Sequence, residues 1–179
     1  IEPPIDFQVD SLEKLEFYPK VFQSLSKIAK ELDYELVMVT NQDGLGTESF
    51  PYDDFMKPHE KMIKCFENEG IVFSDILIDK SFEDEKSPNR KPGIGMLGQY
   101  IYGEYDLQNS FVIGDRITDI QLAQNIGSQA IFINNLQNDN KSDDMQKYLS
   151  ENGKMYKAII YDSLEQFISN LDEEVITLI

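Results

Sequence analysis

The chain has 179 residues, 41% hydrophobic and 27% charged, a balance typical of a single globular domain over residues 1–179. Its formal net charge of −17 at pH 7 argues against nucleic-acid binding, which requires a basic surface. No apolar run is long enough to span a membrane, and the single cysteine, Cys65, cannot form an internal disulfide, which favours the reducing cytoplasm.

Apolar periodicity predicts two helices and two strands in the first half of the chain, after an irregular start. Each helix has one apolar stripe, and the first strand is a continuous apolar run, typical of a strand covered on both faces. The predicted helices are Val21–Leu32 and Pro58–Glu69, and the strands are Glu35–Thr40 and Ile76–Ile78.

In the second half a long polar loop, Asp79–Pro92, leads to further alternating elements. We predict strands over Phe111–Ile113, Ala130–Ile133 and Ala158–Tyr161, and helices over Ile94–Tyr102, Thr118–Asn125, Asp143–Glu151 and Ser163–Leu171. This alternation indicates an α/β fold, a Rossmann-like parallel sheet with helices on both faces. The ending, Asp172–Ile179, is either a terminal strand or the start of a connection to a further domain.

Side chains that suit a phosphate group stand where predicted strands end. Thr40 and Asn41 offer a hydroxyl and an amide after the first strand. Arg90 and Lys91 form the main cluster of cations in an acidic chain. Taken singly, the first pair is also compatible with a capped turn and the second with an ordinary solvated loop.

Two carboxylates follow the strand Phe111–Ile113. Asp115 comes just past Gly114, and Asp119 comes one turn later, where a helix begins. Ligands of open α/β sheets sit outside the carboxyl ends of the strands, and carboxylates there suit Mg²⁺. The alternative is a plain turn in which Asp119 is a solvated helix cap. A hydroxyl, an ammonium and a metal-binding acid at strand ends jointly favour phosphoryl transfer.

These segments resemble three of the four motifs of the haloacid dehalogenase-like phosphatases: Val37–Asn41, Arg90–Pro92 and Val112–Asp119. Within that superfamily, Glu2–Pro4, Asp6–Asp10 and Thr40–Thr47 are similar to the histidinol-phosphate phosphatases. Those enzymes are often the N-terminal half of a bifunctional histidine-biosynthesis protein whose other half is imidazoleglycerol-phosphate dehydratase, so the resemblance implies a fused or associated dehydratase.

The resemblance implies Mg²⁺-dependent hydrolysis of L-histidinol phosphate through an aspartyl-phosphate intermediate. By this resemblance Thr40 and Asn41 hold the phosphate, and Lys91 neutralises it and orients the nucleophile. Asp115 binds Mg²⁺, and Asp119 supports the metal site. Three further residues are expected to face the substrate: Glu2, Gln42 and Arg90.

The chain departs from the family at two places. The first motif, Asp-x-Asp-Gly-Thr, with the nucleophile and the general acid, is absent, so we expect that an N-terminal segment carrying the first strand precedes Ile1 in the natural protein. The loop Asp79–Asn89 lacks the three Cys and one His with which relatives bind zinc, so we predict no structural zinc.

Two rival functions stay open on the sequence. One is a sugar-phosphate phosphatase of the same superfamily, such as a heptose-bisphosphate phosphatase. The other is a non-catalytic phosphate-binding relative, which the absent nucleophile favours and the presence of Thr40, Lys91 and Asp115 opposes. His59, the only histidine, is expected to face out of the second predicted helix or pack within it rather than to catalyse.

Overall fold

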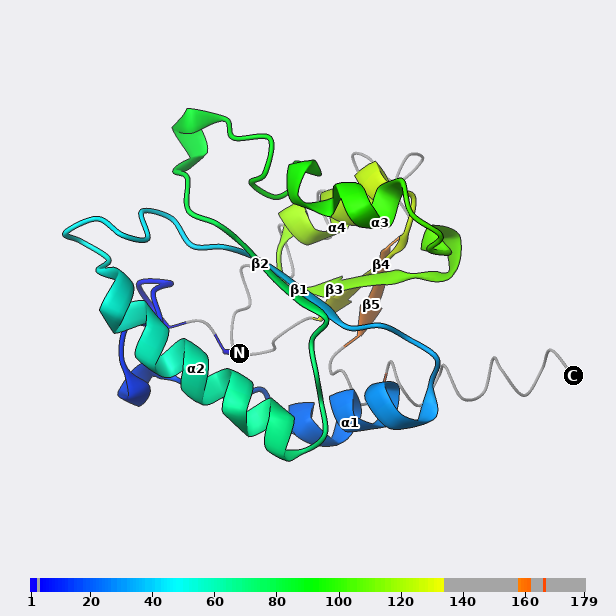
Figure 1. Cartoon of the computed structure of the whole chain (residues 1–179), viewed down its shortest axis with the longest axis horizontal. Helices are drawn as coiled ribbons and strands as arrows, with labels where there is room; N and C mark the ends of the chain where they lie inside the picture. Colours follow the sequence, from blue (N-terminus) through cyan, green and yellow to red (C-terminus); the bar gives the residue numbers. More distant parts are fainter. Residues whose placement is uncertain (3, 134–157, 162–165, 167–179) are drawn as a thin grey trace, which may run out of the picture. The chain divides into compact units, whose positions relative to one another are not determined.

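The computed structural model describes residues 1–2, 4–133, 158–161 and 166. The chain divides into two compact units, Ile1–Arg90 and Lys91–Ile179, which we describe separately (Figure 1). The single domain expected from the length stays a prediction. No helix among the described residues is both long enough and apolar enough to cross a membrane.

The first unit is built on two parallel strands, with Val37 opposite Asp75 and Asn41 opposite Asp79. Its regular elements alternate as the sequence predicts. They are the 3₁₀ turn η1 (Leu12–Lys14), α1 (Val21–Glu31), β1 (Val37–Asn41), α2 (Tyr52–Asn68), β2 (Asp75–Asp79) and the 3₁₀ turn η2 (Glu83–Glu85).

Aromatic side chains join the two helices of the first unit. Phe66 of α2 is 3% exposed, and its ring centroid lies 5.1 Å from that of Phe22 on α1. Phe73, just before β2, meets Phe66 edge to face. A second cluster of Leu45, Phe50 and Phe55 packs against Ile78 of β2 and Met56 of α2. The apolar stripes of both helices are thereby buried, which is the source of most helical stability in proteins.

Two predictions for the first unit need correction. The second helix begins at Tyr52, six residues before the predicted start at Pro58, because Pro58 lies inside the helix and is buried rather than opening it. Asp53 and Asp54 lie in the true first turn, where acidic side chains interact favourably with the helix dipole. The strand β1 is half-buried at every position rather than fully covered, and β2 is its one pairing partner within the described residues.

The second unit contains three parallel strands in the order β3–β4–β5. Its elements are the 3₁₀ turn η3 (Gly95–Leu97), α3 (Gly98–Ile101), the 3₁₀ turn η4 (Leu107–Asn109), β3 (Phe111–Gly114), α4 (Ile117–Ile126), β4 (Gln129–Ile133) and β5 (Ala158–Tyr161). The predicted helix Ile94–Tyr102 is a 3₁₀ turn followed by one short α turn, since Gly95 and Gly98 weaken helical structure.

The helix α4 covers β3 and β4 in the second unit. Ile120 and Ala123 of α4 pack against Ala130 and Phe132 of β4, and all four are at most 2% exposed. The helix ends at Ile126, one residue beyond the predicted end, and it stops there because Gly127 adopts a φ of +79° that favours glycine.

The predicted α/β class is confirmed, and every pair of neighbouring strands in the described residues is parallel. Three predictions lie wholly or almost wholly outside the described residues: the helices 143–151 and 163–171, and the ending 172–179.

Candidate active site

The carboxyl end of β1 presents a hydroxyl that is set up to donate. The Gln42 side-chain amide donates to Thr40 Oγ at 2.8 Å. A hydroxyl that accepts one hydrogen bond still has its own hydrogen to give, so Thr40 can donate to an anionic oxygen. The loop after β1 is fixed by backbone bonds, from Gln42 N–H to the Asp79 carbonyl at 2.8 Å and from Gly44 N–H to the Lys80 carbonyl at 3.1 Å.

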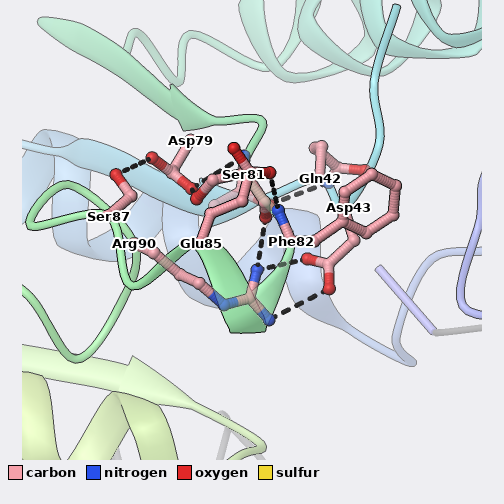
Figure 2. A network of polar contacts seen from close by, with 9 residues as sticks. Gln42, Asp43, Asp79, Ser81, Phe82, Glu85, Ser87 and Arg90 are labelled. Atoms are coloured by element: carbon pink, nitrogen blue, oxygen red, sulfur yellow. Dashed lines mark hydrogen bonds and ion pairs between the residues drawn. The ribbon is translucent and has the colours of Figure 1, made fainter. Parts of the chain in front are cut away.

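A buried carboxylate, Asp79, organises the loop that follows β2 (Figure 2). Asp79 is 6% exposed. Its side chain accepts hydrogen bonds from the backbone N–H of Ser81 at 3.0 Å and from the Ser81 hydroxyl. Its second oxygen accepts from the Ser87 hydroxyl at 2.9 Å. The loop is further closed by Phe82, whose N–H donates to Glu85 Oε1 at 2.7 Å. These bonds satisfy a carboxylate that would otherwise be costly to bury.

Arg90, at the far end of the same loop, is bound at both terminal nitrogens. One donates to Asp43 Oδ1 and to the Ser81 carbonyl, the latter at 3.0 Å, and the other donates to Asp43 Oδ2 at 3.0 Å. The Arg90 side chain is 18% exposed and that of Asp43 44%. This bidentate geometry is the strong form of an arginine–carboxylate pair, and it joins the loop after β1 to the loop after β2.

In the second unit Lys91 forms an ion pair with Asp119. The Nζ–Oδ1 distance is 2.7 Å, and the side chains are 15% and 8% exposed. Asn125 of α4 donates to the Pro92 carbonyl at 2.8 Å, which fixes the backbone next to Lys91. The predicted lysine and the predicted carboxylate are therefore brought together at the start of α4.

Asp119 also caps α4, and it does so from a buried position. Its Oδ2 accepts the N–H of Arg116 at 3.1 Å, so the carboxylate lies at the helix N-terminus, where the helix dipole favours negative charge. The cap alternative considered for Asp119 is thus correct in part, but the side chain is buried rather than solvated. Gly114 lies so close that a Cβ there would be 2.1 Å from Asp119 Oδ2, so only glycine leaves room for this carboxylate.

Asp115 follows β3 directly and is half-buried. The donors that this chain brings to the strand end are carboxylate oxygens, the ligands that Mg²⁺ takes, with water and substrate phosphate completing its shell. No group of three or more His, Cys, Asp or Glu side chains that could hold a metal ion occurs among the described residues. A single carboxylate is compatible with a Mg²⁺ ion that also binds substrate phosphate and water. Mg²⁺ binding at Asp115 and the absence of structural zinc both stay predictions.

The remaining predicted residues lie at the end of β1, in the N-terminal segment and in α2. Asn41 is the last residue of β1. Glu2 is half-buried, and its backbone N–H donates to the Glu16 carbonyl at 2.9 Å. His59 stacks on Phe55 at 4.8 Å, and burial lowers its pKa, which agrees with a packing role.

Within each unit the structure brings predicted site residues together, Gln42 with Thr40 in the first and Lys91 with Asp119 in the second. Sequence reasoning missed Asp43 and Asp79. Asp79 had a usable signal, because it directly follows the apolar run Ile76–Ile78, and Asp115 is likewise separated from the run Phe111–Ile113 by Gly114 alone. Asp43 had none, because its partner Arg90 is 47 residues away along the chain.

Comparison with known proteins finds a matching family model and a set of curated relatives. A HAD-hydrolase-like family model matches residues 88–163. The chain is 60% identical over 134 residues to the histidine biosynthesis bifunctional protein HisB of Bacteroides fragilis, covering 74% of this chain and 36% of that protein. It is 57% identical over 131 residues to the protein of the same name from Spirosoma linguale, covering 73% of this chain and 34% of the relative.

The chain thus spans about a third of the length of these curated relatives. A solved structure, the D,D-heptose 1,7-bisphosphate phosphatase of B. bronchiseptica complexed with magnesium and phosphate, matches 94% of this chain and 90% of its own at a TM-score of 0.74 and 24% identity. At that identity the likeness concerns the fold, which agrees with the predicted haloacid dehalogenase-like architecture.

Proposed function

We propose that this chain, which a HAD-hydrolase-like family model matches over residues 88–163, is a haloacid dehalogenase-like hydrolase that converts L-histidinol phosphate to L-histidinol and phosphate. The reaction class follows the family, and the substrate follows the relatives named for histidine biosynthesis. The proposal includes a dehydratase as a fused or associated partner and a cytoplasmic location.

The structural observation that carries this proposal is the ion pair between Lys91 and Asp119. A lysine that is 15% exposed and held 2.7 Å from a buried carboxylate keeps its ammonium in one place at the start of α4. Phosphoryl transfer depends mainly on fixed positive charge and positioning, because there is little covalent chemistry for the side chains to do. A structural lysine on the surface needs no such restraint.

The proposal gives each remaining residue one task. Thr40 donates its hydroxyl hydrogen, and Asn41 its amide, to phosphate oxygens. Lys91 neutralises the charge that develops on the transferring group. Asp115 holds Mg²⁺, which when bound polarises the phosphate. Glu2, Gln42 and Arg90 face the remainder of the substrate. The attacking and proton-donating aspartates that the resemblance implies are not among the 179 residues, so the assay requires the full natural chain.

The test is phosphate release by the full natural chain from L-histidinol phosphate and from D,D-heptose 1,7-bisphosphate, with Mg²⁺ and with a chelator. We expect a higher kcat/KM for histidinol phosphate, lost with the chelator and restored by Mg²⁺. Faster hydrolysis of the bisphosphate would favour a sugar-phosphate phosphatase, and release from neither substrate would favour a non-catalytic relative. Metal analysis of the same preparation tests the prediction that stoichiometric zinc is absent.

One substitution and a matched control test the lysine. Lys91→Met is expected to lower kcat by about a hundredfold or more, as does removal of other preorganised electrostatic groups. Lys64→Met removes the same charge from an exposed position, where the lysine side chain is 65% accessible and pairs with Glu67. Equal activity losses in the two variants would show that global charge, and not the placement of Lys91, sets the rate.

A further inference from the structure

Arg90 differs from the other cation of its cluster in what binds it. Both of its terminal nitrogens donate to Asp43, and one also donates to the Ser81 carbonyl. The pair carries no net charge, and its bidentate geometry fixes the guanidinium plane. A guanidinium without such a partner is the side chain best suited to bind a phosphate, so its pairing here bears on which substrates can bind.

The pair lies at the end of the strands where ligands are expected. Asp43 follows Asn41, the last residue of β1, by two positions, and Arg90 closes the loop that begins at Asp79, the last residue of β2. Figure 2 shows Asp43 and Arg90 facing one another across these two loops, with Ser81 beside them. Parallel α/β sheets bind ligands beyond these strand ends.

The surroundings hold the pair in place. Gly44, next to Asp43, has a φ of +71°, and its Cα approaches Phe82 so closely that a Cβ would be 2.5 Å from the ring. The Asp79 bonds to Ser81 and Ser87 hold the other loop together. The backbone on both sides of Asp43 is bonded to the neighbouring loop, from Gln42 N–H to the Asp79 carbonyl and from Gly44 N–H to the Lys80 carbonyl, which keeps Asp43 beside Arg90.

We propose that Asp43 determines substrate specificity by neutralising Arg90, so that the site rejects a second phosphate and accepts phosphomonoesters with a neutral or cationic remainder. This inference rests on the proposed function and refines it. Arg90 faces the substrate as half of a neutral pair rather than as an unbalanced cation. A bisphosphate then brings two further negative charges into a chain of net charge −17 without gaining a cationic partner.

The test compares the binding of fructose 6-phosphate and fructose 1,6-bisphosphate, which differ by one phosphate, by calorimetry on the full natural chain with chelator present. In Asp43→Asn the guanidinium loses its counter-charge, and the affinity for the bisphosphate relative to the monophosphate is expected to rise about tenfold or more. Asp43→Ser, which is smaller and cannot overpack, is measured alongside with the same expectation.

Two controls assign the effect. Asp54→Asn makes the same change in net charge on α2, where Asp54 forms an exposed pair with Lys57, and it should leave the ratio unchanged. Adding Arg90→Gln to Asp43→Asn should abolish the gain. A ratio that stays at the wild-type value in both Asp43 variants, or rises equally in Asp54→Asn, or persists without Arg90, would overturn the proposal.

This outcome is independent of the catalytic proposal, because binding is measured without turnover. Failure of the wild-type chain to hydrolyse histidinol phosphate would reject the proposed function, and an unchanged binding ratio would reject the role of Asp43. In an active enzyme the Asp43→Asn variant should also gain kcat/KM on D,D-heptose 1,7-bisphosphate relative to histidinol phosphate.

Discussion

Replacing Asp119 separates two tasks of one buried carboxylate. Asp119→Asn removes the negative charge but keeps an oxygen that can accept the Arg116 N–H, whereas Asp119→Ala removes both. Either variant removes the negative charge that Asp119 places 2.7 Å from the ammonium of Lys91, whose side chain is 15% exposed. Breaking a buried ion pair from one side costs about 3–5 kcal/mol, and because Lys91 retains some solvent contact we expect about 3 kcal/mol for Asp119→Asn. Loss of the cap should add about 1 kcal/mol in Asp119→Ala.

Urea unfolding of the full natural chain, followed by far-ultraviolet circular dichroism, measures both free energies. Lys91→Met and the double variant complete a thermodynamic cycle, and Lys91→Met should cost less, because the remaining Asp119 still lies at the helix N-terminus. Glu67→Gln, which breaks the exposed pair with Lys64, should change stability by at most about 0.5 kcal/mol. A cost below about 1 kcal/mol for Asp119→Asn, or equal stability of the Asn and Ala variants, would contradict the two tasks assigned to Asp119.

Three further predictions concern Gly44, Gly114 and His59. In thermal unfolding, Gly44→Ala should be less stable than Gly46→Ala by about 1–3 kcal/mol. Both glycines have a positive φ, but a Cβ at Gly44 would lie 2.5 Å from the Phe82 ring, whereas a Cβ at Gly46 would have no neighbouring atom within 4 Å. Gly114→Ala should displace the Asp119 carboxylate and lower both the melting temperature and the Mg²⁺-dependent phosphatase rate; unchanged kinetics would refute the close approach. Burial lowers the pKa of His59 below its ordinary value of 6.5, so its neutral form stabilises the fold above that pH. This stability is lost as the pH falls below 6.5 through the folded-state pKa, and His59→Gln should flatten that part of the unfolding profile.

Local sequence patterns determined the elements of this chain well wherever the signal lay within a few residues. The apolar runs placed β2, β3 and β4 to within one residue at either end, and Gly127 marked the end of α4. Capping and periodicity depend on neighbours in the chain, which is why these elements could be read directly. The start of α2 was misplaced, since the helix was predicted to begin at Pro58, whereas Pro58 lies inside α2 although proline usually disfavours a helix interior.

The sequence also predicted a class of chemistry, phosphoryl transfer, from a hydroxyl, a lysine and carboxylates at strand ends. It could not determine the partners of those groups. Lys91 meets Asp119 across 28 residues, and Arg90 meets Asp43 across 47. Which charge neutralises which depends on where the loops beyond parallel strands converge, and that is set by strand register and helix packing rather than by any local pattern. Only the tertiary structure therefore showed that Arg90 is paired and that Asp79, unremarked in the sequence, holds its loop in place.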